Sequence, residues 1–182
     1  PMILHWPEGG LTGGTRFDDF VHATDWLPTV LSSAGAEPPS DIPLDGVNVM
    51  PALQGEQGHV NPRRFWQWNR YAPVGECNAA MRDGDWKLVR PVIKEAMWTS
   101  PDEMAMDRRL ETGEEPFTDI LRTPFPERTL PPPPAPQLYN IAEDPHERND
   151  LAEHHPERAS RMLRDLETWF EAVETDRSTI SE

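Results

Sequence analysis

Residues 64–71 hold the side chains best suited to bind a ligand, because aromatic rings alternate there with polar groups. On a β-strand, Trp66 and Trp68 point to one face and Phe65 points to the other. Two indoles on one face can stack on a sugar or aryl ring while a neighbouring amide hydrogen-bonds its hydroxyls. The chain leaves the strand at Tyr71, and such exits often carry binding residues. The candidate substrate-binding residues are Trp66, Trp68, Asn69, Arg70 and Tyr71.

The same two indoles also suit a purely structural role. Large aromatic side chains dominate the burial of protein cores, so Trp66 and Trp68 would equally fill the space beneath a C-terminal helix. The sequence favours this packing interpretation over substrate binding. Both interpretations require the same strand, and they differ in the direction in which the indoles point.

No other residues form a catalytic or metal-binding pattern, and we assign none to either role. Cys77 has Glu76 and Asn78 as neighbours, which do not create the electropositive surroundings of a reactive thiol, so we expect a buried packing residue. No pair of histidines has the spacing that places two imidazoles on one helical face. Residues 144–147 offer oxygen ligands without the alternating spacing of a calcium loop, which favours a turn.

The composition narrows the classes of partner. The 182 residues carry a formal charge of −15, which argues against nucleic acid or an anionic membrane because phosphate binding needs a basic surface. No apolar run reaches the length of a membrane span. The single cysteine excludes an internal disulfide, so the sequence leaves the compartment open. Only 36% of the residues are hydrophobic, although seven Trp and six Phe partly compensate.

Two groups of elements are expected to position these residues. Residues 2–6 form a short apolar run that suits a buried strand, and a helix is predicted from residue 24 or 25 to Ala34, followed by Gly35 as its cap. The second group begins near Arg63. Its predicted elements are strands at 65–69, 79–82, 86–89 and 137–141, a Pro-rich excursion at 95–136 with a helix near 101–111, and a final amphipathic helix from Pro156 to about Glu174.

Five stretches follow one another in an order that resembles the C-terminal third of the arylsulfatase family. They are the apolar residues 1–7, an Asp-x-x-Pro-Thr-x-Leu helix at 25–31, an Asp-Gly stretch ending in Pro-Ala-Leu at 45–53, an Arg-Asp-Gly-Asp-Trp-Lys-Leu hairpin at 82–89, and a Leu-Tyr-Asn-Ile to Asn-Asp-Leu ending at 138–151. Each stretch is weak evidence alone. Their common order along nearly the whole chain makes the resemblance specific.

The resemblance implies an α+β piece of an α/β alkaline-phosphatase-like fold. Residues 1–55 would be the tail of the large catalytic domain, a strand and a helix. Residues 60–182 would be the smaller C-terminal subdomain, an antiparallel sheet of about four strands packed against a long helix. The family hydrolyses sulfate esters with a formylglycine and calcium, both of which the resemblance places before this chain begins. We therefore expect this chain alone to hold no cofactor and to be inactive.

The expected function is that of a C-terminal region of a sulfatase that acts on carbohydrate or aryl sulfates. The family resemblance implies a periplasmic or secreted location. The expected partner is the remainder of the catalytic domain. The apolar residues 2–4 and the helix face that carries Leu27 and Leu31 are suited to packing against a sheet. Without that partner, the exposed apolar surface should cause self-association. The alternatives are a glycan-binding module that uses Trp66 and Trp68, or a purely structural domain.

Overall fold

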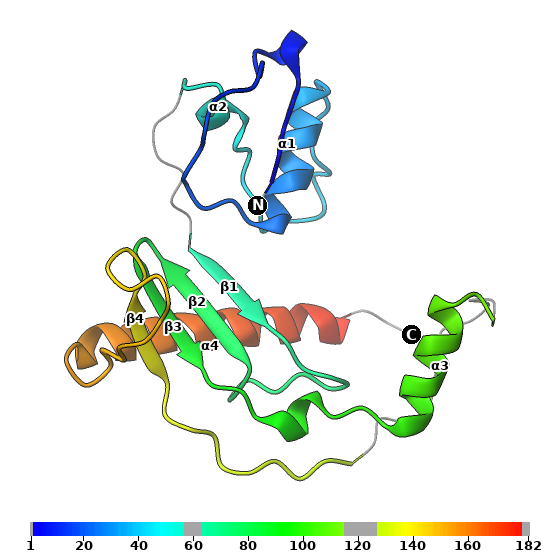
Figure 1. The fold of residues 1–182 in the computed structure, drawn as a ribbon, viewed down its shortest axis with the longest axis vertical. Helices are drawn as coiled ribbons and strands as arrows, with labels where there is room; N and C mark the ends of the chain where they lie inside the picture. The colour runs from blue at the N-terminus through cyan, green and yellow to red at the C-terminus, as the bar shows by residue number, and fades with distance from the viewer. Residues whose placement is uncertain (1, 57–62, 115–126, 180–182) are drawn as a thin grey trace. The chain divides into compact units, whose positions relative to one another are not determined.

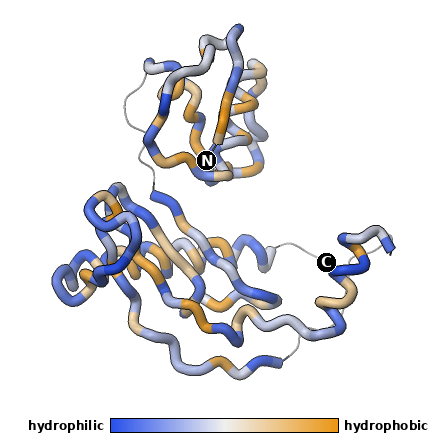
Figure 2. The backbone as a smooth tube through the Cα atoms, viewed as in Figure 1, coloured by the Kyte–Doolittle hydropathy of each residue, from blue (hydrophilic) through white to orange (hydrophobic). Residues whose placement is uncertain are grey.

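The chain folds into two compact units, residues Pro1–Pro62 and Arg63–Glu182. A computed structural model describes residues 2–56, 63–114 and 127–179, drawn as the coloured ribbon in Figure 1. Hydrophobic residues gather within helices and strands of both units, as Figure 2 shows. The predicted division, with residues 1–55 as the tail of a larger catalytic domain and residues 60–182 as a C-terminal subdomain, stays a prediction.

The first unit is built from short helices and loops. Its elements are the 3₁₀ helices η1 (Pro7–Gly9) and η2 (Ala23–Asp25) and the α-helices α1 (Trp26–Ser33) and α2 (Met50–Leu53). The predicted helix is confirmed, and Gly35 takes the left-handed conformation just beyond its end, with φ of 66°. The expected apolar face is largely in solvent, since Leu27 is 51% and Val30 is 53% exposed.

The strand expected at residues 2–6 is wrong for this unit. Only Trp6 forms an isolated antiparallel bridge, with Leu11, and Ile3 is 94% exposed. A strand needs a hydrogen-bonding neighbour along its length. Residues 2–56 contain no sheet that could supply one, so the apolar run stays irregular.

The second unit is an α+β structure, as the sequence predicted. Its antiparallel sheet has the order β1-β2-β3-β4, with β1 at Arg64–Gln67, β2 at Ala79–Asp83, β3 at Trp86–Arg90 and β4 at Gln137–Asn140. Gly84 in the tight turn between β2 and β3 has φ of 60°, which glycine adopts without strain. The helix α4 (Pro156–Thr179) lies across one face of the sheet (Figure 1).

The core lies between the sheet and α4. Leu88 and Leu138 from the strands and Met162 and Leu166 from the helix are at most 1% exposed. Burial of each such side chain contributes about 1.5–3 kcal/mol. The helix continues to Thr179, beyond its predicted end near Glu174. Its apolar stripe stops earlier because the last turns are polar.

The excursion after β3 contains η3 (Lys94–Met97) and α3 (Pro101–Glu111), which confirms the predicted helix near 101–111. The Ser100 hydroxyl accepts a hydrogen bond from the Glu103 N–H, and the Glu103 carboxylate accepts one from the Ser100 N–H. These reciprocal bonds satisfy donors at the first turn of α3. The middle of the expected excursion, residues 115–126, lies outside the described residues.

Candidate functional site

The strand β1 directs Trp66 away from α4. Phe65 stacks on Trp169 of α4 with ring centroids 5.2 Å apart and an interplanar angle of 7°. Side chains alternate along a strand, so Trp66 lies on the opposite face of the sheet, where it is half-buried. The interpretation that it fills the core beneath the C-terminal helix is therefore wrong. The signal for the correct face was the alternation of Phe65 with Trp66.

Trp68 lies just beyond the end of β1 and is 70% exposed. Its backbone N–H still donates to the carbonyl oxygen of Asn78, at 2.9 Å, which fixes the start of the loop. Its indole is therefore available to a ligand, and it does not fill a core.

Asn69 organises the loop that follows. Its Oδ1 accepts hydrogen bonds from the Val74 N–H at 2.7 Å and from Gln67 Nε2 at 2.8 Å. Its Nδ2 donates to the carbonyl oxygen of Trp68 at 2.9 Å. The side-chain amide of Asn69, which the sequence suggested as a partner for a sugar hydroxyl, forms its hydrogen bonds within the chain. Asn69 therefore shapes the loop that carries Trp68.

Arg70 and Tyr71 hold the helix α3. Arg70 donates from Nε to Thr99 Oγ1 and from Nη2 to Asp107 Oδ2, both at 3.0 Å. The Tyr71 hydroxyl donates to the Glu103 carboxylate. That hydrogen bond raises the pKa of Tyr71 and lowers the pKa of Glu103. The structure therefore ties two of the five candidate residues to the excursion and one to its own loop.

The face that carries Trp66 also carries a row of cations. The register aligns Arg64 with Arg82 and Arg82 with Lys87 across three strands. The Lys87 ammonium is 2.6 Å from the Glu147 carboxylate, and Arg82 Nε donates to the Gly84 carbonyl at 2.9 Å. Three positively charged side chains are therefore aligned across β1, β2 and β3 on this face.

A pocket of about 430 Å³ opens beside η3 in the second unit. No sequence motif indicates this pocket, because it joins residues from two separate parts of the excursion. The residues that line it are Lys94, Glu95, Trp98, Glu127, Arg128 and Thr129. The guanidinium of Arg128 joins the two sides by donating to the carbonyl of Ala96 at 2.7 Å and to that of Ala72 at 2.8 Å. We call this hollow the Trp98 pocket.

Cys77 is fully buried and packs in a cluster with Ile93 and Ala96. Burial raises the pKa of its thiol, which lowers the thiolate fraction at neutral pH. This is the packing residue that its neighbours in the sequence indicated.

Three curated proteins illustrate what the chain resembles; no family model matches it. Ulvan-active sulfatase of Formosa agariphila is 26% identical over 183 residues, covering 94% of this chain and 33% of that protein. Human steryl-sulfatase is 26% identical over 183 residues, covering 100% of this chain and 28% of that protein. Mouse arylsulfatase J is 27% identical over 167 residues, covering 84% of this chain and 26% of that protein. Over most of its length the chain is similar to the C-terminal region of these sulfatases, and we call it the sulfatase region for this similarity.

This sulfatase region spans a third or less of the length of those relatives. Its fold has a counterpart among solved structures. The crystal structure of Ps i-CgsB matches with a TM-score of 0.57 and 24% identity, over 91% of this chain and 27% of that one. The same protein in complex with k-i-k-neocarrahexaose matches equally well. The shared architecture confirms the α+β fold class.

In this sulfatase region the motif residues of the first unit hold the loop at residues 45–49 against the start of α1. The buried Asp25 Oδ1 accepts the Val47 N–H at 2.9 Å, and Thr29 Oγ1 accepts the Val49 N–H at 3.0 Å. A Cβ at Gly46 would lie 2.0 Å from the Thr24 carbonyl oxygen, so only glycine fits there. The Asp-x-x-Pro-Thr and Asp-Gly motifs are therefore two halves of one structural contact.

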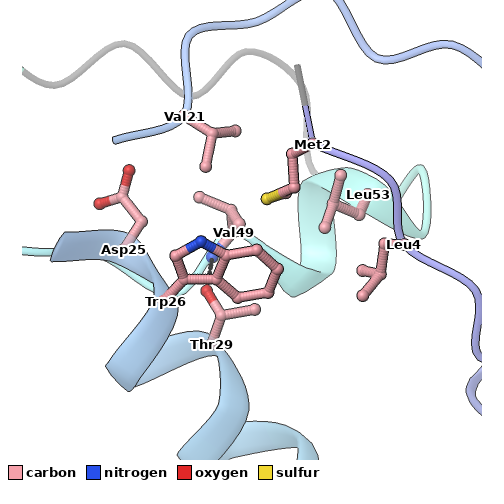
Figure 3. Close-up of a pocket in the computed structure, with 8 residues that line it drawn as sticks. All are labelled: Met2, Leu4, Val21, Asp25, Trp26, Thr29, Val49 and Leu53. Carbon is pink, nitrogen blue, oxygen red and sulfur yellow. Dashed lines mark hydrogen bonds between the residues drawn. The ribbon is translucent and has the colours of Figure 1, made fainter. Parts of the chain in front are cut away.

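The same residues border a small apolar pocket of about 10 Å³ (Figure 3). It is lined by Met2, Leu4, Val21, Asp25, Trp26, Thr29, Val49 and Leu53. A space of this size holds at most about one water molecule. It is a packing defect of the sulfatase region and offers no room for a substrate.

The last motif of the sulfatase region also forms a turn. Asp144 Oδ2 accepts the N–H groups of Arg148 at 2.6 Å and Asn149 at 2.8 Å, and these bonds, that of Asn149 first, lower its pKa. Asp150 Oδ1 accepts the N–H groups of Leu138 and Ala152, each at 2.9 Å. Both carboxylates serve the backbone. Residues 2–56, 63–114 and 127–179 contain no group of three or more His, Cys, Asp or Glu placed to hold a metal ion.

Proposed function

We propose that this chain is the C-terminal part of an enzyme that hydrolyses sulfate esters of carbohydrates or aryl compounds. The observation that supports it most is the alignment with curated sulfatases over 94–100% of the chain. Those relatives are named for ulvan and for steryl sulfates, a polysaccharide and a small fused-ring class. The resemblance also favours a periplasmic or secreted location.

The chemistry of such an enzyme would come from groups outside the described residues. In an enzyme of this family, calcium would supply positive charge against the sulfate and a formylglycine would supply the nucleophile. We assign no ligand of calcium to the residues described, because their Asp144 and Asp150 carboxylates already accept backbone hydrogen bonds. We propose that this chain instead completes the fold and lines the substrate side.

We propose that the first unit docks on the remainder of the catalytic domain. Its support is the exposure of apolar side chains at Ile3, Leu27 and Val30, which are 94%, 51% and 53% exposed. Contiguous exposed apolar residues mark interaction surfaces. The irregular run at residues 2–6 would gain its missing strand neighbour from that partner.

No helix among the residues described is both long and apolar enough to span a membrane.

Within the second unit we propose Trp66 and Trp68 as the residues nearest to substrate. Trp68 supports this through its 70% exposure. Asn69, Arg70 and Tyr71 would act indirectly, since their polar groups hold the loop and α3. The five candidates thus divide into two that would touch a ligand and three that position them.

The test is hydrolysis of an aryl sulfate, 4-nitrophenyl sulfate, by the 182-residue chain and by its complete reading frame. We expect release of 4-nitrophenol by the longer protein and none above background by this chain. Turnover by this chain alone would contradict the assignment of the catalytic groups to another segment. A longer protein that carries the formylglycine motif yet hydrolyses neither aryl nor carbohydrate sulfates would overturn the proposed activity.

The second candidate function is a glycan-binding module without catalysis, favoured by the exposed indole of Trp68. It predicts saturable changes in tryptophan fluorescence when this chain is titrated with oligosaccharides. Those changes should vanish in Trp68→Ala. This function would replace the first only if the complete reading frame showed binding without hydrolysis.

A further inference from the structure

The Trp98 pocket combines the two kinds of group that a sugar ring requires. Trp98 is 49% exposed, so its indole offers an apolar surface to the C–H face of a pyranose. The carboxylates of Glu95 and Glu127 can accept hydrogen bonds from hydroxyl groups, and the Lys94 ammonium can donate them. A pocket of about 430 Å³ is within the range of small-molecule sites.

The floor of the pocket is fixed although its walls reach solvent. Arg128 donates to the Ala96 and Ala72 carbonyls and lies over the Tyr71 ring, with 5.4 Å from its central carbon to the ring centroid. Ala96 is fully buried beside Cys77 and Ile93. Pre-organised groups bind a ligand without a further loss of conformational entropy. Arg128 is therefore held in place before a ligand binds.

The charges further limit the class of ligand. Two carboxylates and two cations line the pocket, so it has no net charge in a chain of −15. Such a pocket does not repel an anionic saccharide as the rest of the surface does. A sulfate or uronate substituent would gain from the ammonium of Lys94. The fitting ligand is a polyhydroxylated ring that carries an anionic group.

We propose that the Trp98 pocket binds one ring of a sulfated oligosaccharide, as a subsite separate from the bond that is cleaved. The inference rests on the proposed function for the nature of the substrate and deepens it by naming where this chain holds that substrate. It also assigns to the Tyr71 ring a contact with Arg128 that the sequence did not indicate. The guanidinium of Arg128, which lines the pocket, lies over the ring of Tyr71.

The experiment is isothermal titration of the 182-residue chain with ulvan oligosaccharides and with the same oligosaccharides after desulfation. We expect Trp98→Ala to weaken binding of both by about tenfold, because a lost stacking contact is worth on the order of 1.4 kcal/mol. Trp98→Tyr keeps a ring and should restore most of the affinity. Lys94→Gln should weaken binding of the sulfated probe only, by about threefold, the effect of an exposed charge pair.

Trp68→Ala is the matched comparison, since it removes another exposed indole of the same unit. Equal affinity of Trp98→Ala and the unmodified chain would overturn the proposal, and so would the absence of binding by the unmodified chain at millimolar probe. Loss of binding in Trp68→Ala alone would move the subsite to the end of β1. These binding results are independent of aryl sulfate hydrolysis by the complete reading frame, so the failure of one proposal is distinguishable from the failure of the other.

Discussion

Each of the two units is stabilised internally by a different kind of interaction. The second unit has a continuous apolar core in which Met81, Leu88, Leu138, Met162 and Leu166 are at most 1% exposed. The first unit relies on hydrogen bonds from Asp25 and Thr29 to loop backbone, while several of its apolar side chains face solvent. The comparison indicates that the second unit stabilises itself and that the first is completed by a partner.

The largest expected effect is the loss of a core side chain in the second unit. Leu88 is fully buried between β2, β4 and α4, so Leu88→Ala leaves a cavity and should lower the free energy of unfolding by about 2–5 kcal/mol. Urea denaturation followed by circular dichroism measures this. Val92 lies in the same unit and is 66% exposed, so Val92→Ala should change stability by less than about 0.5 kcal/mol. Similar losses in the two variants would show that no such core exists.

The next effect tests the polar contact in the first unit. Asp25 is fully buried and accepts the N–H groups of Val47 at 2.9 Å and His22 at 2.7 Å. Asp25→Ala leaves both donors unsatisfied, which should cost about 1–3 kcal/mol. Amide hydrogen exchange should speed up at Val47 while the strands of the second unit stay protected. The exposed Asp45, two residues before Val47, serves as control because Asp45→Ala should leave exchange at Val47 unchanged.

Local signals explain which parts of the fold could be predicted from the sequence. The Asp-Gly pair fixed the hairpin at Gly84, and the three- and four-residue spacing of apolar side chains identified α4. The strand at residues 2–6 failed because a strand depends on a neighbour that its own residues do not supply. For Trp66 the alternation was visible, but residue type alone favoured burial under the helix.

The Trp98 pocket could not be predicted because it depends on tertiary contacts. Arg128 and Ala96 are 32 residues apart in the chain, and a Pro-rich segment separates them. Neither residue belongs to a motif. The hydrogen bonds of Asn69, Arg70 and Tyr71 were hidden for the same reason, since their partners lie in the loop and in α3.

A smaller effect follows from the exposed apolar residues of the first unit. Leu27 and Val30 lie one turn apart on α1, so the double variant Leu27→Lys/Val30→Lys should reduce self-association of the chain. Sedimentation velocity over a range of concentrations would show this as a lower weight-average mass. Val92→Lys/Thr175→Lys adds the same charge in the second unit and should leave the mass unchanged. A monomeric unmodified chain would contradict the partner-dependent interpretation of the first unit.

The smallest effect concerns the hydrogen bond between Tyr71 and Glu103. It lowers the pKa of the Glu103 carboxyl in the folded chain, so the contact stabilises α3 at neutral pH and is lost as the pH falls through that lowered pKa. Tyr71→Phe should raise the pKa of Glu103 toward its ordinary value, as followed by carboxyl chemical shifts in an NMR titration. Glu174, whose pKa is lowered by Arg177, should titrate as before. An unchanged pKa of Glu103 would mean that Ser100 alone holds the carboxylate, so that α3 would not depend on the Tyr71 hydroxyl.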